Sequence, residues 1–153
     1  MGGSKVAHAG GCISLQIPDD TGYLHVVRRA VRRAASWAGF GPIDALKITM
    51  AVDEACVNII EHGYETLSSG PTGKPIRVNV EADREQIRVS IRDAAPQFAP
   101  QHFRCPSLEE YARRDPPKGL GLRIIQTFVD YIEHSYQPGK GNTVRLVKYR
   151  SRS

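Results

Sequence analysis

The composition describes one folded domain with a modest positive charge. The chain has 153 residues, of which 41% are hydrophobic and 24% are charged, and its formal net charge is +5. This length is sufficient to bury a core but short for two domains. We therefore predict one domain over residues 12–150, between a flexible N-terminal segment, 1–11, and a short tail, 151–153.

Charge, cysteine spacing and hydropathy exclude several classes of protein. The basic residues form neither a tail nor an arginine-rich motif, so direct nucleic-acid binding is not expected. The three cysteines lack the paired spacing of a zinc site, and we expect them to be reduced. No apolar run is long enough to span a bilayer, and no signal-peptide core follows Met1. We expect a cytoplasmic protein that has no membrane partner.

The first part of the chain predicts a strand followed by two helices. Residues 12–18 alternate apolar and polar side chains and end at a proline, as a half-buried strand does. Capping side chains at 19–21 precede a helix that ends at Gly39 and Gly41. Its apolar repeat is Tyr23, Val27, Ala30, Ala34 and Trp37. Pro42 suits the first turn of a second helix, which ends near residue 63.

A basic cluster lies on the first of these helices. Its members are Arg28, Arg29, Arg32 and Arg33. Two interpretations are open, namely a solvated face opposite the buried stripe and a surface that binds a partner.

The second part of the chain predicts more strands and one long loop. Residues 76–80 and 87–91 alternate like two strands joined by a turn near 83–86. Periodicity disappears and prolines recur over residues 94–118, which predicts a lid-like loop with one helical turn at 107–111. A helix then runs from Gly119 to about Asp130. Residues 131–136 and 143–149 form a hairpin.

The second predicted helix carries a polar face in an otherwise apolar sequence. At about 100° per residue, Glu54, Asn58 and Glu61 fall within roughly 60° of one another. Apolar side chains line both flanks, so we expect much of the helix to be buried: Leu46, Met50, Val57 and Ile60 on one side, and Ile48, Val52 and Ile59 on the other. Asp53 interrupts the first stripe without an evident partner. A carboxylate and an amide one turn apart can serve a metal-bound phosphate.

Two further motifs follow this helix, and the ordered set resembles a known family. Asp93 ends a predicted strand, and Gly119-x-Gly121 opens the later helix. Together with Glu54 and Asn58 they resemble the Bergerat-type ATP-binding fold, in particular its small bacterial branch, the anti-sigma-factor serine/threonine kinases. The resemblance covers about residues 12–149. It implies an α+β fold, a two-layer sandwich in which a mixed, mostly antiparallel sheet is covered on one face by about three helices.

The resemblance implies a role in binding ATP and Mg²⁺ for each residue of the motifs. Glu54 would be the catalytic carboxylate that accepts a proton from the attacking hydroxyl. Asn58 would be the magnesium ligand, since Mg²⁺ prefers oxygen ligands. Asp93 would accept a hydrogen bond from the adenine amino group, which selects against guanine. Each residue also has a structural alternative. Glu54 is then a solvated helix carboxylate, Asn58 a polar residue at the boundary of the core, and Asp93 a residue that starts a turn.

The other residues implied to contact the nucleotide come from the loop, the later helix and the last strand. They are Ala95, Lys118, Gly119, Leu120, Gly121, Leu122 and Thr143. Gly119 and Gly121 would bring backbone N–H groups and a helix N-terminus to the phosphates. Lys118 would add a positive charge there, or is a solvated lid residue. Thr143 would lie near the base, although threonine is common in strands.

The chain departs from the family pattern directly after Asp93. Many Bergerat proteins have Asp-x-Gly-x-Gly at this point, whereas this chain has Asp93-Ala94-Ala95-Pro96-Gln97. The methyl group of Ala95 penalises a positive φ and would lie against the adenine, and Gln97 places an amide at the lid hinge. We therefore expect nucleotide binding to be weaker than in members that keep both glycines.

Three functions are compatible with these residues. The first is an ATP- and Mg²⁺-dependent serine/threonine protein kinase that phosphorylates a small anti-sigma-factor antagonist of the STAS-domain type. The resemblance leaves open whether a sigma factor is a second partner and whether the chain forms a homodimer. The second is a regulatory binding module whose nucleotide binding is weak or lost. The third is a free-standing ATPase.

Overall fold

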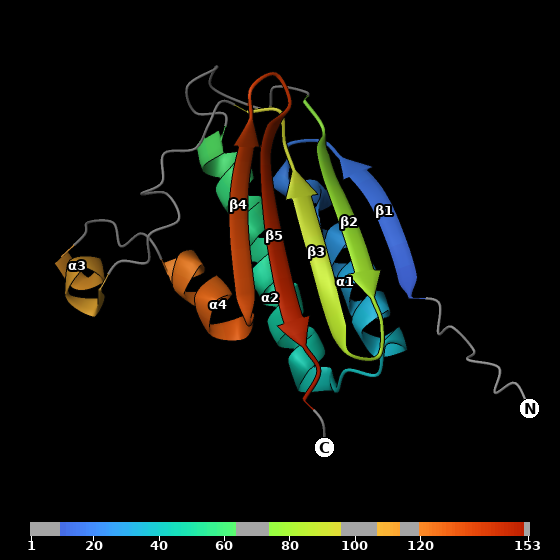
Figure 1. Ribbon diagram of the computed structural model, residues 1–153. Coiled ribbons are helices and arrows are strands. Elements are labelled where there is room, and N and C mark those ends of the chain that lie inside the picture. Colours follow the sequence, from blue (N-terminus) through green and yellow to red (C-terminus); the bar gives the residue numbers. More distant parts are fainter. Residues whose placement is uncertain (1–9, 64–73, 96–106, 114–119, 152–153) are drawn as a thin grey trace, which may run out of the picture.

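The computed structural model describes residues 10–63, 74–95, 107–113 and 120–151. One layer of the fold is a five-stranded sheet in the order β1-β2-β3-β5-β4 (Figure 1). Its strands are β1 Gly11–Ile17, β2 Ile76–Ala82, β3 Gln86–Arg92, β4 Tyr131–Gln137 and β5 Gly141–Tyr149. Every pairing between these strands is antiparallel. The predicted α+β class is confirmed, but the described strands contain no parallel pair, unlike the mixed sheet that we expected.

Helices cover one face of this sheet and form the second layer (Figure 1). They are α1 Leu24–Trp37, α2 Pro42–Asn58 and α4 Leu120–Phe128. A shorter helix, α3 Leu108–Arg113, lies to the side of the sandwich and matches the single turn predicted near residue 107. No helix within the described ranges is long and apolar enough to cross a membrane.

The ends of α1 and α2 follow local chain chemistry. Asp20 accepts a hydrogen bond from the backbone N–H of Gly22 at 2.8 Å, and this cap starts a 3₁₀ turn, Thr21–Tyr23, before α1 begins. Pro42 occupies the first turn of α2. The α-helical geometry ends at Asn58 and continues as a π-helical turn, Ile59–Gly63. Such turns are frequent at functional sites, and this one directly follows the predicted metal ligand.

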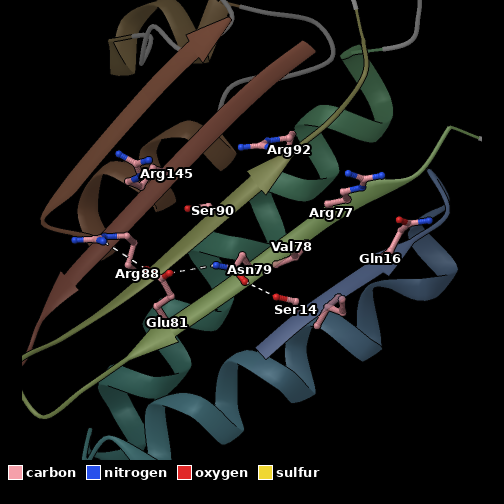
Figure 2. A pocket seen from close by; sticks show the side chains of 11 residues that line it. Ser14, Gln16, Arg77, Val78, Asn79, Glu81, Arg88, Ser90, Arg92 and Arg145 are labelled. Atoms are coloured by element: carbon pink, nitrogen blue, oxygen red, sulfur yellow. Dashed lines mark hydrogen bonds and ion pairs between the residues drawn. The ribbon is translucent and has the colours of Figure 1, made fainter. Parts of the chain in front are cut away.

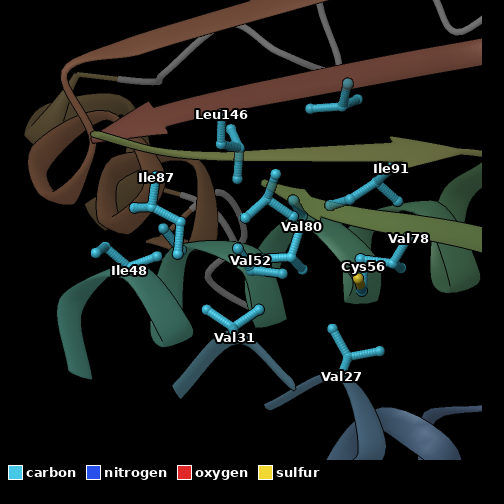
Figure 3. Close-up of a cluster of buried hydrophobic side chains, with 14 of the residues drawn as sticks. Val27, Val31, Ile48, Val52, Cys56, Val78, Val80, Ile87, Ile91 and Leu146 are labelled. Carbon is cyan, nitrogen blue, oxygen red and sulfur yellow. The ribbon is translucent and has the colours of Figure 1, made fainter. Parts of the chain in front are cut away.

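The core lies between α1, α2 and the helix-facing side of the sheet (Figure 3). Ile48, Val52 and Ile59 are buried as predicted. Tyr23 and Trp37 are exposed instead, because the buried stripe of α1 is shifted to Leu24, Val27, Val31, Ala34, Ala35 and Ala38. Much of α2 is buried as expected, and Val57 and Ile60 pack against the core, but Leu46 and Met50 of the same predicted stripe are exposed.

Two of the three cysteines lie within the described residues, and both are free thiols. Cys56 is fully buried in the core, and burial raises its pKa to about 12. This thiol is therefore protonated and unreactive at neutral pH. Cys12 is exposed on β1.

The other face of the sheet is open and polar (Figure 2). It carries a shallow concavity of about 640 Å³. Four arginines of β2, β3 and β5 line it: Arg77, Arg88, Arg92 and Arg145. Arg145 pairs with Glu133 at 3.1 Å, and Arg88 approaches Glu81 at 3.4 Å.

Candidate functional site

The predicted site residues lie where β3, β5 and α2 meet. Figure 1 shows that α2 ends at the same edge of the molecule as β3, next to the turn between β4 and β5. Asp93 directly follows β3 at this edge. Its backbone N–H donates to the carbonyl oxygen of Asn142 at 3.0 Å, which ties the end of β3 to the start of β5.

Asp93 is buried and held by one of its two carboxylate oxygens. Its Oδ1 accepts hydrogen bonds from the backbone N–H of Ala95 at 2.7 Å and from Nδ2 of Asn142 at 3.1 Å. Its Oδ2 is buried and has no hydrogen-bond partner among the described residues. A buried oxygen without a donor is costly, so this atom marks a place where a ligand donor fits. An adenine amino group is such a donor.

Burial also changes the ionisation of Asp93. Only 2% of its surface is exposed, and this desolvation raises the pKa of the carboxyl. The hydrogen bonds from Asn142 and Ala95 act in the opposite direction but do not outweigh burial. A further donor on Oδ2 would stabilise the carboxylate form.

Ala95 is accommodated without the strain that the missing glycines suggested. Within the described residues, glycine alone adopts a positive φ, so the alanine backbone is relaxed. Ala95 is 2% exposed and packs in the core cluster, while its N–H completes the turn at Asp93. Gln97, the other substitution in the family motif, lies outside the described residues.

Gly141 makes the close approach at this edge possible. Its φ is +97°, and a Cβ built on it would overlap the carbonyl oxygen of Asp93 and lie 2.8 Å from the Cα of Ala94. The glycine is therefore needed for two reasons, backbone conformation and space. It lets β5 begin directly against the turn that presents Asp93.

Asn142, rather than Thr143, is the β5 side chain that reaches Asp93. Asn142 is fully buried, and its Nδ2 also donates to the carbonyl oxygen of Ala95 at 3.3 Å. Side chains alternate along a strand, so Thr143 lies on the open face of the sheet. Its neighbours in the strand register are Arg92 of β3 and Ser135 of β4. The predicted placement of Thr143 near the base does not match this geometry. A strand period of two places Asn142 on the same buried face as Val144, and this sequence signal could have revealed the role of Asn142.

His134 of β4 extends the network behind Asn142. Its Nε2 lies 2.9 Å from Oδ1 of Asn142. Nδ2 of Asn142 faces two acceptors, which turns Oδ1 toward the imidazole and makes Nε2 the donor. The three side chains thus form a chain of hydrogen bonds that fixes the orientation of Asp93. His134 could not be identified from the sequence, because a single histidine in a strand carries no specific signal.

Glu54 lies on α2 in contact with the first turn of α4. A Cβ added to Gly121 would overlap its Oε2, so α4 can approach α2 this closely only because residue 121 is glycine. Partial burial is the main cause that raises the pKa of Glu54, and the nearby charges of Asp53 and Glu61 add to it. The structure therefore places a half-buried carboxylate against Gly121 of the glycine motif.

Asn58 follows Glu54 by one helical turn and is half-buried. Within the described part of the chain, no three His, Cys, Asp or Glu side chains cluster in a way that could hold a metal ion. One amide oxygen suits Mg²⁺, which keeps several waters and takes further ligands from phosphates.

The partner of Asp53 is an arginine of the basic cluster. Arg28 of α1 donates from Nε to Oδ1 of Asp53 at 2.7 Å and from NH2 to Oδ2 at 3.3 Å. Asp53 hence joins the two helices and is accounted for without a catalytic role. The other three arginines of the cluster are exposed.

Several predicted site residues cannot be placed. Lys118 and Gly119 lie outside the described residues, as do the Pro96-x-Phe98-x-Pro100 run and most of the predicted lid. Leu120 begins α4, and Leu122 is buried against the core. The described part of the candidate site is therefore the edge at Asp93 and the face of α2.

A family model covers nearly the whole chain. The model of the histidine kinase-like ATPase domain matches residues 17–148. The chain belongs to this family. The match includes the Asp93 edge, the face of α2 and the glycine turn, so the site described above lies within the family domain.

Curated relatives of this ATPase domain are kinases by name. The chain is 27% identical to the serine-protein kinase RsbW of Bacillus velezensis over 148 residues, which cover 90% of this chain and 84% of the relative. It is 28% identical to the serine-protein kinase RsbW of Bacillus mycoides over 142 residues, which cover 92% and 86%.

A solved structure supports the fold. The chain resembles the crystal structure of the RsbU and RsbW domains of a Mycobacterium tuberculosis protein with a TM-score of 0.61 and 21% identity. The match covers 94% of this chain but 33% of that longer one. At this identity the likeness shows the fold alone.

Proposed function

We propose that the chain is an ATP- and Mg²⁺-dependent serine/threonine protein kinase of the anti-sigma-factor type. Its protein substrate would be a small antagonist of the STAS-domain type. The observation that carries the proposal is the buried Oδ2 of Asp93, which has no hydrogen-bond partner among the described residues and lies at the same edge of the molecule as the end of α2 that carries Glu54. The names of the similar kinases from Bacillus support the protein substrate.

Asp93 would recognise the base of the nucleotide. Its Oδ2 is an acceptor in a buried position, and Asn142 and Ala95 hold the carboxylate through Oδ1. Adenine offers an amino group to this acceptor, whereas guanine offers a carbonyl oxygen at the equivalent position. The edge would therefore select ATP over GTP.

Glu54 and Asn58 would act at the phosphate end. When bound, ATP supplies the phosphoryl group and Mg²⁺ neutralises its negative charge. The Glu54 carboxylate would accept the proton of the substrate hydroxyl, and the raised pKa of this carboxyl moves its basicity toward the working pH. The amide oxygen of Asn58 would hold the metal, and the first turn of α4, packed on Glu54 through Gly121, would meet the phosphates.

Phosphorylation itself would favour release of the substrate protein. A phosphoserine or phosphothreonine carries about two negative charges at neutral pH. Glu54 of α2 and Glu61 of the π-helical turn that follows it would repel this group, because their charges are close enough to affect one another. A sigma factor as second partner, homodimer formation and a cytoplasmic location remain predictions.

Calorimetry and phosphate transfer together test the proposal. We expect ATP with Mg²⁺ to bind, GTP to bind more weakly, and Asp93→Asn to remove the preference, because an amide at that position can also donate. We expect labelled γ-phosphate to appear on a candidate STAS-domain antagonist with the unmodified chain but not with Glu54→Ala. Absence of ATP binding at high micromolar concentration would favour the binding module. Steady phosphate release without a protein substrate would favour the ATPase.

A further inference from the structure

An apolar stripe lies on the solvent side of α2, where the core cannot explain it. Ile43 is 71% exposed, Leu46 is 46% exposed and Met50 is 39% exposed. Their spacing of three and four residues places them side by side on one helix face. The opposite face of α2 is buried against the sheet, so this helix is apolar on both sides although only one side is covered. An exposed contiguous stripe of this kind marks an interaction surface.

A shallow groove runs beside the stripe between the two helices. It has a volume of about 400 Å³. Its lining residues are Arg32, Ser36, Phe40, Pro42, Ala45 and Leu46. The floor is mostly apolar, and the α1 side is basic. The groove therefore offers a place for an apolar side chain of a partner next to a positive rim.

The arginines of the positive rim form no ion pair within the described part of the chain. Arg29, Arg32 and Arg33 are exposed and make no ion pair there, whereas their neighbour Arg28 is neutralised by Asp53. Helical spacing keeps Arg29, Arg32 and Arg33 on adjacent positions of α1. Apolar anchors beside unpaired arginines are typical of the centre of a protein interface. The charge favours a partner whose flanks are acidic.

The stripe leads directly to the carboxylate at the candidate active site. Ile43 and Glu54 are eleven residues apart on one helix, which corresponds to roughly 16 Å. Met50 lies one turn from Glu54 and on the same side of the helix. A segment of about three helical turns that lies along the stripe would therefore reach the phosphate end of the site.

We propose that the outer face of α1 and α2 is a docking surface for an amphipathic, acidic helix of the protein substrate. Ile43, Leu46 and Met50 bind its apolar side, and Arg29, Arg32 and Arg33 bind its acidic flank. The identification of the partner as the kinase substrate rests on the proposed function. The surface itself rests on exposure and charge, and it can be tested without nucleotide or phosphate transfer.

The probe is a fluorescently labelled helical peptide with leucines at positions i, i+3 and i+7 and glutamates on both flanks. Fluorescence anisotropy measures its affinity for the full chain without ATP. We expect Leu46→Ser combined with Met50→Ser to weaken binding by about tenfold or more, and Arg29→Glu combined with Arg32→Glu to do the same. The same peptide with lysines in place of the glutamates should bind at least about tenfold more weakly than the acidic one.

Two matched variants on the open sheet face serve as controls. Arg77→Glu combined with Arg92→Glu changes the net charge by the same amount, and Tyr131→Ser combined with Tyr149→Ser removes comparably exposed apolar groups. Both should keep the affinity within about twofold. Absence of peptide binding, equal binding of the two peptides, or equal losses in the controls would overturn the docking surface. If the chain transfers phosphate but does not bind the peptide, the docking surface is wrong and the kinase function stands. If it binds the peptide but transfers no phosphate, the kinase function is wrong and the docking surface stands.

Discussion

The two walls of the candidate site are built in opposite ways. At the base edge, Asp93, Asn142 and His134 are joined by hydrogen bonds, and Asp93 and Asn142 are almost completely buried. On the face of α2, Glu54 and Asn58 are half-exposed. In the first wall, Oδ2 of Asp93 is the carboxylate oxygen that has no hydrogen-bond partner among the described residues. The second wall offers groups that a bound ligand must bring together.

This difference assigns selection of the nucleotide base to one wall and the phosphate-transfer reaction to the other. A buried network has one geometry, because any other arrangement leaves polar groups unsatisfied, and so it can discriminate between bases. A half-exposed carboxylate can accept a proton and can be approached by a protein substrate. Changes at the base edge should therefore affect stability and ligand selection together. Changes on α2 should affect the reaction and leave the fold intact.

Replacement of Glu54 by glutamine should give the largest effect and confine it to the reaction. We expect phosphate transfer to fall by about 10²–10⁴-fold, which is the usual contribution of a positioned general base. ATP affinity measured by calorimetry should stay the same, because Glu54 is assigned to the hydroxyl and not to the nucleotide. An equal loss of ATP affinity would show that the two walls are not separate.

The pH dependence of the same reaction tests whether Glu54 accepts the proton. Burial raises the pKa of Glu54, so transfer should rise with pH through an inflection above the ordinary glutamate value of about 4.3. A raised carboxyl pKa means that the folded state holds the proton more tightly than the unfolded state. Its contribution to stability is present below the unfolded pKa and is lost as pH rises through the folded pKa. Glu54→Gln should therefore be at least as stable as the unmodified chain at neutral pH.

Replacement of Gly141 by alanine should damage the base edge through the fold itself. The new Cβ would overlap the carbonyl oxygen of Asp93 at a φ of +97°. We expect the free energy of unfolding to fall by roughly 2–4 kcal/mol, measured by urea denaturation, together with loss of ATP binding. Gly139→Ala is the matched control, because Gly139 also has a positive φ, +77°, but has open space around it. It should lose only about 1–2 kcal/mol and keep ATP binding.

Replacement of Asn142 by alanine should test whether the network orients Asp93. The carboxylate loses the donor on the Asn142 side chain, and the carbonyl oxygen of Ala95 loses a partner. We expect a loss of about 1–3 kcal/mol in stability and a smaller ratio of ATP to GTP affinity in calorimetry. Thr143→Ala is the control, since Thr143 lies on the opposite face of β5 and should change neither quantity. An unchanged affinity ratio in Asn142→Ala would mean that Asp93 is oriented without it.

Most of the fold could be predicted from the sequence, because its elements are periodic and their ends carry local signals. Alternation in residues 76–80 and 87–91 identified β2 and β3, and Pro42 marked the start of α2. Asp93, Glu54 and Asn58 were predicted as site residues because the resemblance covers motifs in a fixed order. Local pattern was sufficient wherever a residue's neighbours in sequence are also its neighbours in space.

The rest depended on contacts between distant segments. The partner of Asp53 lies 25 residues away on another helix, and the partner of Asp93 lies 49 residues away. The expected burial of Leu46 and Met50 was wrong because apolar character does not show which side of a helix meets the sheet. Thr143 was predicted and Asn142 was not considered, because the motif does not specify the face of the strand. Where an apolar residue is exposed against expectation, a partner is a physical reason for it.

Replacement of Arg28 by alanine should give the smallest effect and test the boundary between the two walls. The pair with Asp53 is largely solvent-exposed on the Arg28 side, so its loss should cost less than about 1 kcal/mol. The charge of Asp53 raises the pKa of Glu54, and without the guanidinium this charge is no longer compensated. We expect the pKa of Glu54 to rise further, by an amount that added salt reduces. Carboxyl-carbon NMR titration measures this shift without any substrate. A pKa that stays unchanged would mean that the surface pair between α1 and α2 does not influence Glu54, and that the pKa of this carboxyl is set by its own burial against Gly121.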